Sequence, residues 1–260
     1  MRALYTAATG MGAFQTKIDN IANNLANSNT NGFKKVREGF EDLVYQRMGN
    51  IGGDQGASVT NPLDLGTGVR LSYLSRNMQN GDTIASSSPS DLLIDGDGFF
   101  VVESPNGEQL YTRDGHFQTD SDGNLVNAHG YRVAPGIQVP EGGTLIVGSD
   151  GSVSAQVTTA AGSETIALGT LELARFPNPD GLEAVGGNSY RASTASGEPI
   201  QTTPGEDGAG QVLQYAIEGS NVDVAEELVN MITAQRSYEL SSKVIQAADE
   251  MMQTAASLRR

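Results

Sequence analysis

The stretch "LYTAATGMGAFQTKIDNIANNLANSNTNG", residues 4–32, carries the strongest structural pattern in the chain. Its apolar residues recur at alternating steps of three and four, which is the spacing of a stripe along one face of a helix. A helix of about 25 residues with so narrow a stripe buries too little surface to be stable alone. The stretch therefore predicts a long N-terminal helix that needs a partner. The stripe consists of Leu4, Ala7, Met11, Phe14, Ile18, Ile21 and Leu25.

A second helical pattern occupies the C-terminal end of the chain. It follows Gly219–Asn221, where we expect the N-cap, and it runs toward Arg260 without glycine or proline. Acidic residues at positions 223, 226 and 227 favour a helix start there because they oppose the positive end of the helix dipole. Such a helix can reach about 38 residues, or ~55 Å. Its stripe runs through Val224, Leu228, Met231, Ala234, Tyr238, Ser241, Ile245, Ala248, Met252 and Ala255.

The middle of the chain has the pattern of a β domain. Turn glycines recur every seven or eight residues at Gly107, Gly115, Gly123 and Gly130, and this spacing is typical of a meander of strands and turns. The predicted strands are Gln109–Thr112, His116–Thr119, Leu125–Val126, "GFFVVE" (Gly98–Glu103) and "TIALGTLELARF" (Thr165–Phe176).

These patterns predict an α+β fold in which discontinuous terminal α-helices form a coiled-coil-like domain, an all-β central domain is looped out, and an extended segment links them. The alternative is an ordinary globule whose terminal helices pack on a central sheet. We expect a helical domain at 1–30 plus 221–260, a linking domain at 31–85 plus about 213–220 with an insertion at 46–64, and an outer all-β domain at 86–212.

Charge narrows the classes of partner. The chain carries a net charge of −15; residues 41–220 carry −16, whereas residues 1–40 carry +3. Such an acidic middle repels nucleic acid and anionic lipid, so we expect neither as a partner. No apolar run approaches the roughly 20 residues that span a bilayer, and Lys17 and Asp19 interrupt the N-terminal stripe. We therefore expect neither a membrane span nor a cleaved signal peptide.

The sequence offers little that is typical of an enzyme. It has no cysteine, and its two histidines, His116 and His129, stand beside turn glycines, where exposed residues are common. "DSDGN" (Asp120–Asn124) lacks the EF-hand spacing and suits a turn. A carboxylate pair for glycoside chemistry stays open, although no pair stands out. We expect no catalysis, cofactor or metal. A β-rich binding module and a carbohydrate-active enzyme are the weaker alternatives.

Three blocks together resemble the bacterial flagellar rod and hook family. They are "IANNLANSNTNGFKK" (21–35), "DLLIDGDGFFVVESPNGEQLYTRDGHFQTDSDGNLVNAHGYRV" (91–133) and "SNVDVAEELVNMITAQRSYELSSKVIQAADEMM" (220–252). Their order and their spread over both ends and the middle make the resemblance specific. The segment "FEDLVYQ" (40–46), followed by a polar insertion and "GTGVR" (66–70), is most similar to the family members that build the distal part of the rod.

The resemblance implies a structural subunit that polymerises helically into the rigid distal rod, transmits torque from motor to hook and encloses the export channel. A proximal rod subunit or a hook-type subunit is the alternative. The implied partners are further copies of the chain, proximal rod subunits, the hook protein, the periplasmic and outer-membrane rings and the flagellar type III export apparatus. The implied location is the basal body, in the periplasm and across the outer-membrane ring region.

Three sets of residues are candidates for assembly. We expect the helical stripes to contact neighbouring subunits, although an intramolecular core would need the same stripes. Asparagines beside the first stripe are candidates for packing and register, unless they face channel water or only end the helix, with Asn29–Gly32 as its turn. The resemblance implies that the insertion bridges neighbours and stiffens the rod. The stripe residues are Leu4, Met11, Phe14, Ile18, Ile21, Leu25, Val224, Leu228, Met231, Tyr238, Ile245 and Met252; the amides are Asn20, Asn23, Asn24 and Asn27; the stiffening segment includes Gln46, Ile51, Val59, Pro62 and Asp64.

Overall fold

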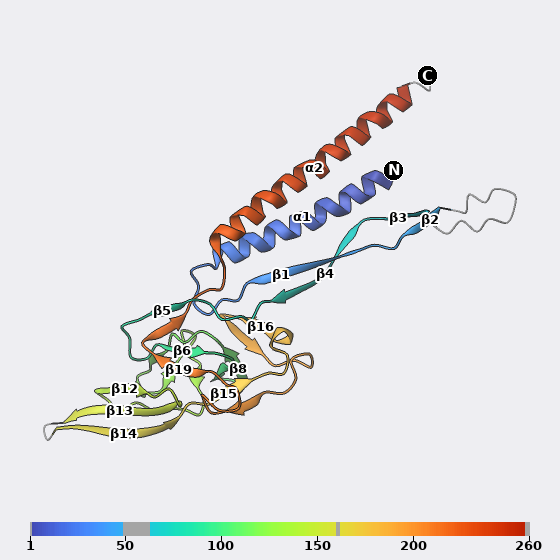
Figure 1. The fold of residues 1–260 in the computed structure, drawn as a ribbon. Coiled ribbons are helices and arrows are strands. Elements are labelled where there is room, and N and C mark those ends of the chain that lie inside the picture. Colours follow the sequence, from blue (N-terminus) through green and yellow to red (C-terminus); the bar gives the residue numbers. More distant parts are fainter. Residues whose placement is uncertain (1, 49–62, 160–161, 258–260) are drawn as a thin grey trace. The chain divides into compact units, whose positions relative to one another are not determined.

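The fold is given by a computed structural model that describes residues 2–48, 63–159 and 162–257 (Figure 1). The chain divides into two compact units. The helical unit comprises Met1–Ala26, Val36–Ser75 and Asp223–Arg260. The β unit comprises Asn27–Lys35 and Arg76–Val222. The predicted α+β class, with a helix at each end and β structure between, is confirmed.

Two long helices form the main part of the helical unit. Helix α1 (Arg2–Ala26) has 25 residues and α2 (Val224–Ser257) has 34, and they lie side by side (Figure 1). The expected N-cap between Gly219 and Asn221 is wrong. Asp223 caps α2, because its Oδ1 atom accepts hydrogen bonds from the backbone N–H groups of Ala225 (2.8 Å) and Glu226 (3.2 Å).

A two-stranded ribbon completes the helical unit. Strand β1 (Val36–Asp42) pairs with β4 (Val69–Arg76), and β2 (Gln46–Met48) pairs antiparallel with β3 (Leu63–Leu65). Gly39 in β1 leaves room for the ring of Tyr73 on β4, which a Cβ at this position would displace. The ribbon includes the described parts of the linking segment, residues 36–48 and 63–76.

The β unit is built around a nine-stranded antiparallel sheet. β7 is its central strand and pairs with three neighbours: β8, β11 and β15. The path of the sheet is β16 (Glu183–Gly186), β17 (Ser189–Arg191), β8 (Gln109–Thr112), β7 (Phe99–Glu103), β11 (Arg132–Val133), β10 (Leu125–Val126) and β9 (Gln118–Thr119), with β15 (Leu173–Arg175) joining β7 to β18 (Ile200–Thr202).

Smaller sheets surround this one in the β unit. A three-stranded sheet has the order β12 (Gly143–Val147), β13 (Ser152–Thr159) and β14 (Gly162–Thr170). Strand β6 (Leu92–Asp95) pairs with β19 (Gln211–Gln214), and β5 (Thr83–Ala85) pairs with β20 (Ala216–Glu218). A 3₁₀ turn at Pro179–Gly181 precedes β16.

The strand predictions have mixed outcomes. Strands at Gln109–Thr112 and Leu125–Val126 are confirmed, whereas the strand predicted from His116 begins only at Gln118. The strand structure predicted at 165–176 is confirmed as two strands, β14 and β15, separated by residues 171–172. The predicted meander is confirmed for β9, β10 and β11, which pair in chain order. It does not extend to β8, because β9 pairs only with β10 among the described strands, and β11 pairs with β7.

The apolar run "FFVV" (Phe99–Val102) of β7 reflects burial on both faces of the sheet. Phe100 and Val102 belong to one hydrophobic cluster, and Phe99 and Val101 belong to a second. Alternation along a strand sends successive side chains to opposite faces, so a strand between two cores must be apolar at every position. The second cluster is largely aromatic, with the rings of Tyr111 and Phe176 meeting edge to face at 4.8 Å.

Candidate assembly interface

The predicted stripe on α1 is largely covered within the helical unit. Ile21 is 3 % exposed, and the other stripe residues, Leu4, Met11, Phe14, Ile18 and Leu25, are partly buried. This stripe therefore contributes to packing against α2 in the same chain. Whether it also contacts a second chain stays a prediction.

The stripe on α2 is much less covered. Met231 and Ile245 are partly buried, whereas Val224, Leu228, Tyr238 and Met252 are all exposed. The side chains of α2 that are fully buried within its described length are Glu227, Ala234 and Ala248. Its apolar residues therefore find little cover within a single chain.

A further apolar set on α2 was missed by the sequence reasoning. Its members are large, and each is at least half exposed: Val229, Ile232, Leu240, Val244 and Met251. The signal was present, because steps of three, four and seven residues connect several of them. It was overlooked because only one stripe was sought. A helix that is apolar on more than one side is normally buried, so α2 has the surface of a helix that lies among other helices.

The asparagines have a role within the chain. Asn24 is 1 % exposed, and its amide forms two hydrogen bonds with the backbone of Val36, the first residue of β1. Nδ2 donates to the Val36 carbonyl (3.0 Å), and Oδ1 accepts from the Val36 N–H (3.0 Å). Asn20 Nδ2 also donates to the Val36 carbonyl (3.0 Å). The side chain of Asn24 also lies 3.5 Å from Oε2 of Glu227, so it joins both helices to the ribbon.

The remaining amides of that run lie at the end of α1. Asn23 is exposed, and Asn27 accepts a hydrogen bond from the Thr30 hydroxyl at 3.3 Å. The predicted turn at Asn29–Gly32 is confirmed, with Gly32 at a φ of 66°. Contacts of these amides with a second chain stay a prediction.

The predicted stiffening segment is only partly described by the structure. Gln46 lies opposite Leu65 in the ladder of β2 and β3, and Asp64 lies opposite Arg47. Ile51, Val59 and Pro62 lie outside the described residues. The ribbon itself exposes apolar side chains at Val44, Tyr45, Leu65, Leu71, Tyr73 and Leu74, which the sequence reasoning did not single out.

The β unit contains a buried ionic cluster that sequence reasoning also missed. Glu218 on β20 is 1 % exposed, and its Oε1 accepts hydrogen bonds from Lys34 Nζ (2.6 Å) and from the Gly81 N–H (2.9 Å). Nη1 of Arg113 lies 3.5 Å from Oε2 of Glu218. Burial lowers the pKa of both cations, and the carboxylate of Glu218 opposes this effect. The cluster holds the segment that follows α1 beside the strand that precedes α2.

The two histidines differ in their surroundings. His116 is part of a polar group, with Nδ1 2.8 Å from Oδ1 of Asp91, whereas His129 is exposed. Burial raises the pKa of the neighbouring Asp114 carboxyl above its usual value. Within the described residues, no three His, Cys, Asp or Glu side chains converge in a way that could hold a metal ion. No described helix combines the length and hydropathy that crossing a membrane requires.

Three family models match this chain. "Flagella basal body rod protein" matches residues 4–34, "Flagellar hook protein FlgE/F/G D1 domain" matches 93–155, and "Flagellar basal body rod FlgEFG protein C-terminal" matches 213–258. Relatives called flagellar basal-body rod protein FlgG are similar over their whole length. Those of Borreliella burgdorferi and Caulobacter vibrioides are 43% and 41% identical, covering 100% of this chain and 99% and 100% of the relatives. The chain belongs to the flagellar basal-body rod protein family.

Within the rod family, the chain is more similar to these FlgG proteins than to a FlgF protein. The flagellar basal-body rod protein FlgF of Caulobacter vibrioides is 32% identical over 97% of this chain, compared with 41% for the FlgG protein of the same organism. The family matches at 4–34 and 213–258 include the stripe on α1 and all of α2, so the exposed apolar surface of α2 lies within the rod-family signature.

Proposed function

We propose that this chain is a structural subunit of the flagellar basal body, and that copies of it polymerise helically into the distal part of the rod. The observation that carries the proposal is the exposed apolar surface of α2. Leu240 and Met251 alone are 61% and 68% exposed. Exposed apolar surface of this extent on one element marks an interaction site. Relatives over the full length are called rod proteins, which supports a second copy as the partner.

The proposed interface joins different surfaces of successive copies. A contact of this kind repeats by a screw operation and gives a filament instead of a closed ring. We assign the helices to an inner tube around a channel, residues 31–85 with about 213–220 to a linking layer, and residues 86–212 to an outer layer. Side-chain interdigitation between neighbouring helices would give the polymer the axial stiffness that torque transmission needs.

The proposal includes partners and a location. The subunit would meet proximal rod subunits below, the hook protein above, and the periplasmic and outer-membrane rings around it, after passing the flagellar type III export apparatus. The insertion at 46–64 would bridge neighbours and keep the rod straight, so its deletion should leave a rod that assembles and bends more easily. A straight, rigid rod in electron micrographs of the deletion strain would contradict that role.

The assembly surface can be tested with matched variants of α2. The variant Leu240→Asp/Met251→Asp places charge on the exposed apolar set. The control Gln235→Asp/Gln246→Asp places the same charge on polar exposed positions of the helix. Replaced in the chromosome, the first pair should abolish motility and leave basal bodies without a complete rod, while the control retains both. Full motility with intact rods in the first strain would overturn the proposed interface. The helicity of both proteins, measured by circular dichroism, separates assembly from folding.

A further inference from the structure

We propose that the outer edge of β14 is a docking site for an extended, lysine- or arginine-bearing segment of another protein, which pairs with β14 and seats its side chains in the hollow beside it. The proposal goes beyond rod assembly, because it concerns the β unit alone and does not depend on how the helices pack.

The first support is that β14 is a long edge strand. It has nine residues and pairs with β13, which lies between it and β12, and none of the other described strands pairs with it. Alternate residues of such a strand turn their backbone N–H and C=O groups away from the sheet, where a further strand can bind them. Natural edges are usually protected by lysine, by proline, by short length or by a β-bulge. The register of β14 with β13 shifts at Leu168, so the regular part of this edge is residues 162–167. Residues 162–170 contain neither lysine nor proline, and Glu164 is their only charge.

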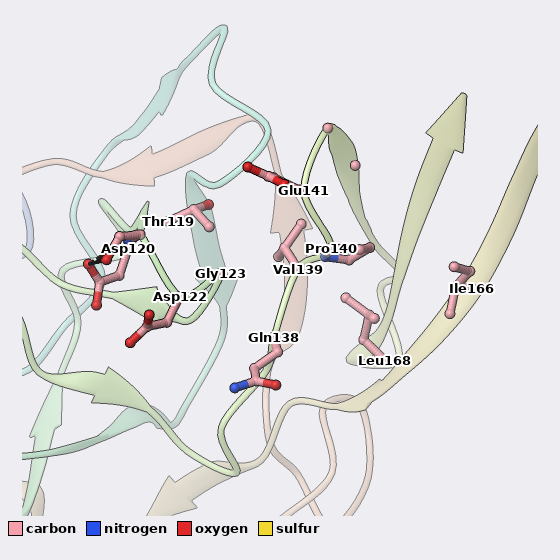
Figure 2. A pocket seen from close by; sticks show the side chains of 13 residues that line it. Thr119, Asp120, Asp122, Gly123, Gln138, Val139, Pro140, Glu141, Ile166 and Leu168 are labelled. Carbon is pink, nitrogen blue, oxygen red and sulfur yellow. Dashed lines mark hydrogen bonds between the residues drawn. The ribbon is translucent and has the colours of Figure 1, made fainter. Parts of the chain in front are cut away.

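The second support is a hollow that β14 helps to form. It has a volume of about 770 Å³ and is open to solvent. In Figure 2, Ile166 and Leu168 lie on the side of β14 that faces Val139 and Pro140, and Ile166 is 41% exposed. Both side chains line the hollow, although the register of β14 with β13 shifts at Leu168. A segment paired with β14 would send every second side chain toward this same face.

The third support is the charge around the hollow, which selects the partner. Asp120, Asp122 and Glu141 line it, and the described residues that line it include no lysine, arginine or histidine (Figure 2). Valine or isoleucine side chains suit the apolar floor, and lysine or arginine at the ends suits the acidic rim. A second copy of the chain is a poor occupant, because the β strands of residues 41–220 belong to a stretch with a net charge of −16.

The test uses the purified full-length chain and a seven-residue probe peptide, acetylated and amidated. The probe has lysine at positions 1 and 7, valine at positions 3 and 5, and threonine at positions 2, 4 and 6. Its lysine and valine side chains then share the face that matches the hollow. Backbone pairing predicts slower hydrogen exchange of the amides within 163–170 when the probe is bound, with no change in β12. A probe with glutamate in place of lysine should not bind.

Two N-methylated probes test the backbone pairing directly. One carries the methyl groups on the valines at positions 3 and 5, and the other carries them on the threonines at positions 2 and 4. Only alternate residues of a strand face a given neighbour, so one of these probes should lose binding and the other should retain it. Equal binding by both would overturn the pairing.

Matched substitutions locate the site. Ile166→Lys should weaken the binding of the probe about tenfold, since it removes apolar contact and adds like charge. Ile146→Lys is the control, because Ile146 is 39% exposed and lies on β12, the opposite edge strand of the same sheet. It should leave the Kd unchanged. Near-UV circular dichroism would show that both variants keep their fold.

The acidic rim has its own matched pair of variants. Asp122→Asn/Glu141→Gln should weaken binding about fivefold at low salt, whereas Asp180→Asn/Glu198→Gln, which removes the same charge outside the hollow, should not. Three results would overturn the proposal: no binding of the probe, binding without protection of residues 163–170, or a dimer of the chain that Ile166→Lys dissociates.

Discussion

The buried cluster around Glu218 gives the sharpest test of what stabilises the β unit. The substitution Glu218→Gln keeps the shape of the side chain and removes its charge. It leaves the cations of Lys34 and Arg113 buried without their anion, and both side chains are at most 3% exposed. Removal of one member of a buried ion pair typically costs about 3–5 kcal/mol. We expect a loss of that size in the free energy of unfolding of the β unit.

Lys34 should respond differently from Glu218. In Lys34→Met, Glu218 keeps the hydrogen bond from the Gly81 N–H and its contact with Arg113, so no charge is left unpaired. We expect this variant to lose about 2 kcal/mol, the magnitude of a hydrogen bond to a charged group. The double variant should be more stable than the sum of the two losses predicts. Glu218→Gln alone leaves two buried cations without their anion, whereas in the double variant only Arg113 is left in that state.

The pH dependence of Glu218→Gln adds a second signature. Burial already lowers the pKa of Lys34, and Glu218 opposes this, so loss of the carboxylate should lower that pKa further. The unfolded state then binds more protons than the folded state between the lowered pKa and the usual value of 10.5, and the stability of the variant rises with pH in that window. The deficit relative to the wild type should therefore shrink as the pH rises from neutral toward 10.

The assay is urea unfolding followed by near-UV circular dichroism, to which Tyr111 and Tyr190 in the aromatic cluster of the β unit contribute. Glu183→Gln is the control, because Glu183 is 64% exposed and lies 3.8 Å from Arg191, and surface pairs of this kind contribute less than about 1 kcal/mol. A loss for Glu218→Gln no larger than that of the control would refute the reasoning. So would a deficit that grows with pH.

Three further substitutions have defined outcomes. Asp114→Asn should remove the titration of a carboxyl group whose pKa is raised in the folded state. The contribution of such a group to stability is present below the usual pKa near 3.8 and is lost as the pH rises through the raised value. The wild type should therefore gain stability relative to the variant on acidification, as measured by thermal unfolding between pH 7 and 4. Gly115→Ala should cost about 3 kcal/mol in urea unfolding, because its Cβ would overlap the Leu92 carbonyl, whereas Gly107→Ala, where space is open, should cost less. Asn24→Ala should cost about 2 kcal/mol, because the Val36 N–H loses its partner while Asn20 still donates to the Val36 carbonyl; unchanged hydrogen exchange of the Val36 amide would contradict this.

Local patterns in the sequence predicted which segments form helices and strands better than they predicted which strands pair with each other. The stripe from Leu4 to Leu25 determines α1 because helix periodicity depends only on residues three and four apart. The apolar run Phe99–Val102 of β7 was likewise visible as a strand. Its neighbours β11 and β15 were not visible, because these pairings join residues far apart in the chain. The turn spacing predicted that β8 and β9 are neighbours, but β8 pairs with β7 and β17, and β9 pairs with β10.

Polar residues in the core were the hardest to predict. Lys34 stands in the sequence as an ordinary basic residue after a turn, and Glu218 lies 184 positions away, so neither position signals burial or a partner. The sequence predicts a packing role for Asn24 but not its partner, because the group that Asn24 binds is the backbone of Val36, which leaves no trace in residue identity. The glycine spacing predicts a turn at Gly115, but it does not predict that this glycine allows close approach of the Leu92 carbonyl.

The two units differ in what stabilises them, and this difference favours assembly through the helices. Nearly all buried apolar residues in the described part of the chain belong to the β unit, where they form two clusters. Most of the exposed large apolar residues belong to the helical unit. Burial of apolar surface is the main favourable term in folding, so the β unit holds a core of its own, whereas the helical unit buries little within one chain. Contacts with further copies would supply that missing burial. The stability of the helices should then depend on subunit concentration, while that of the β unit should not.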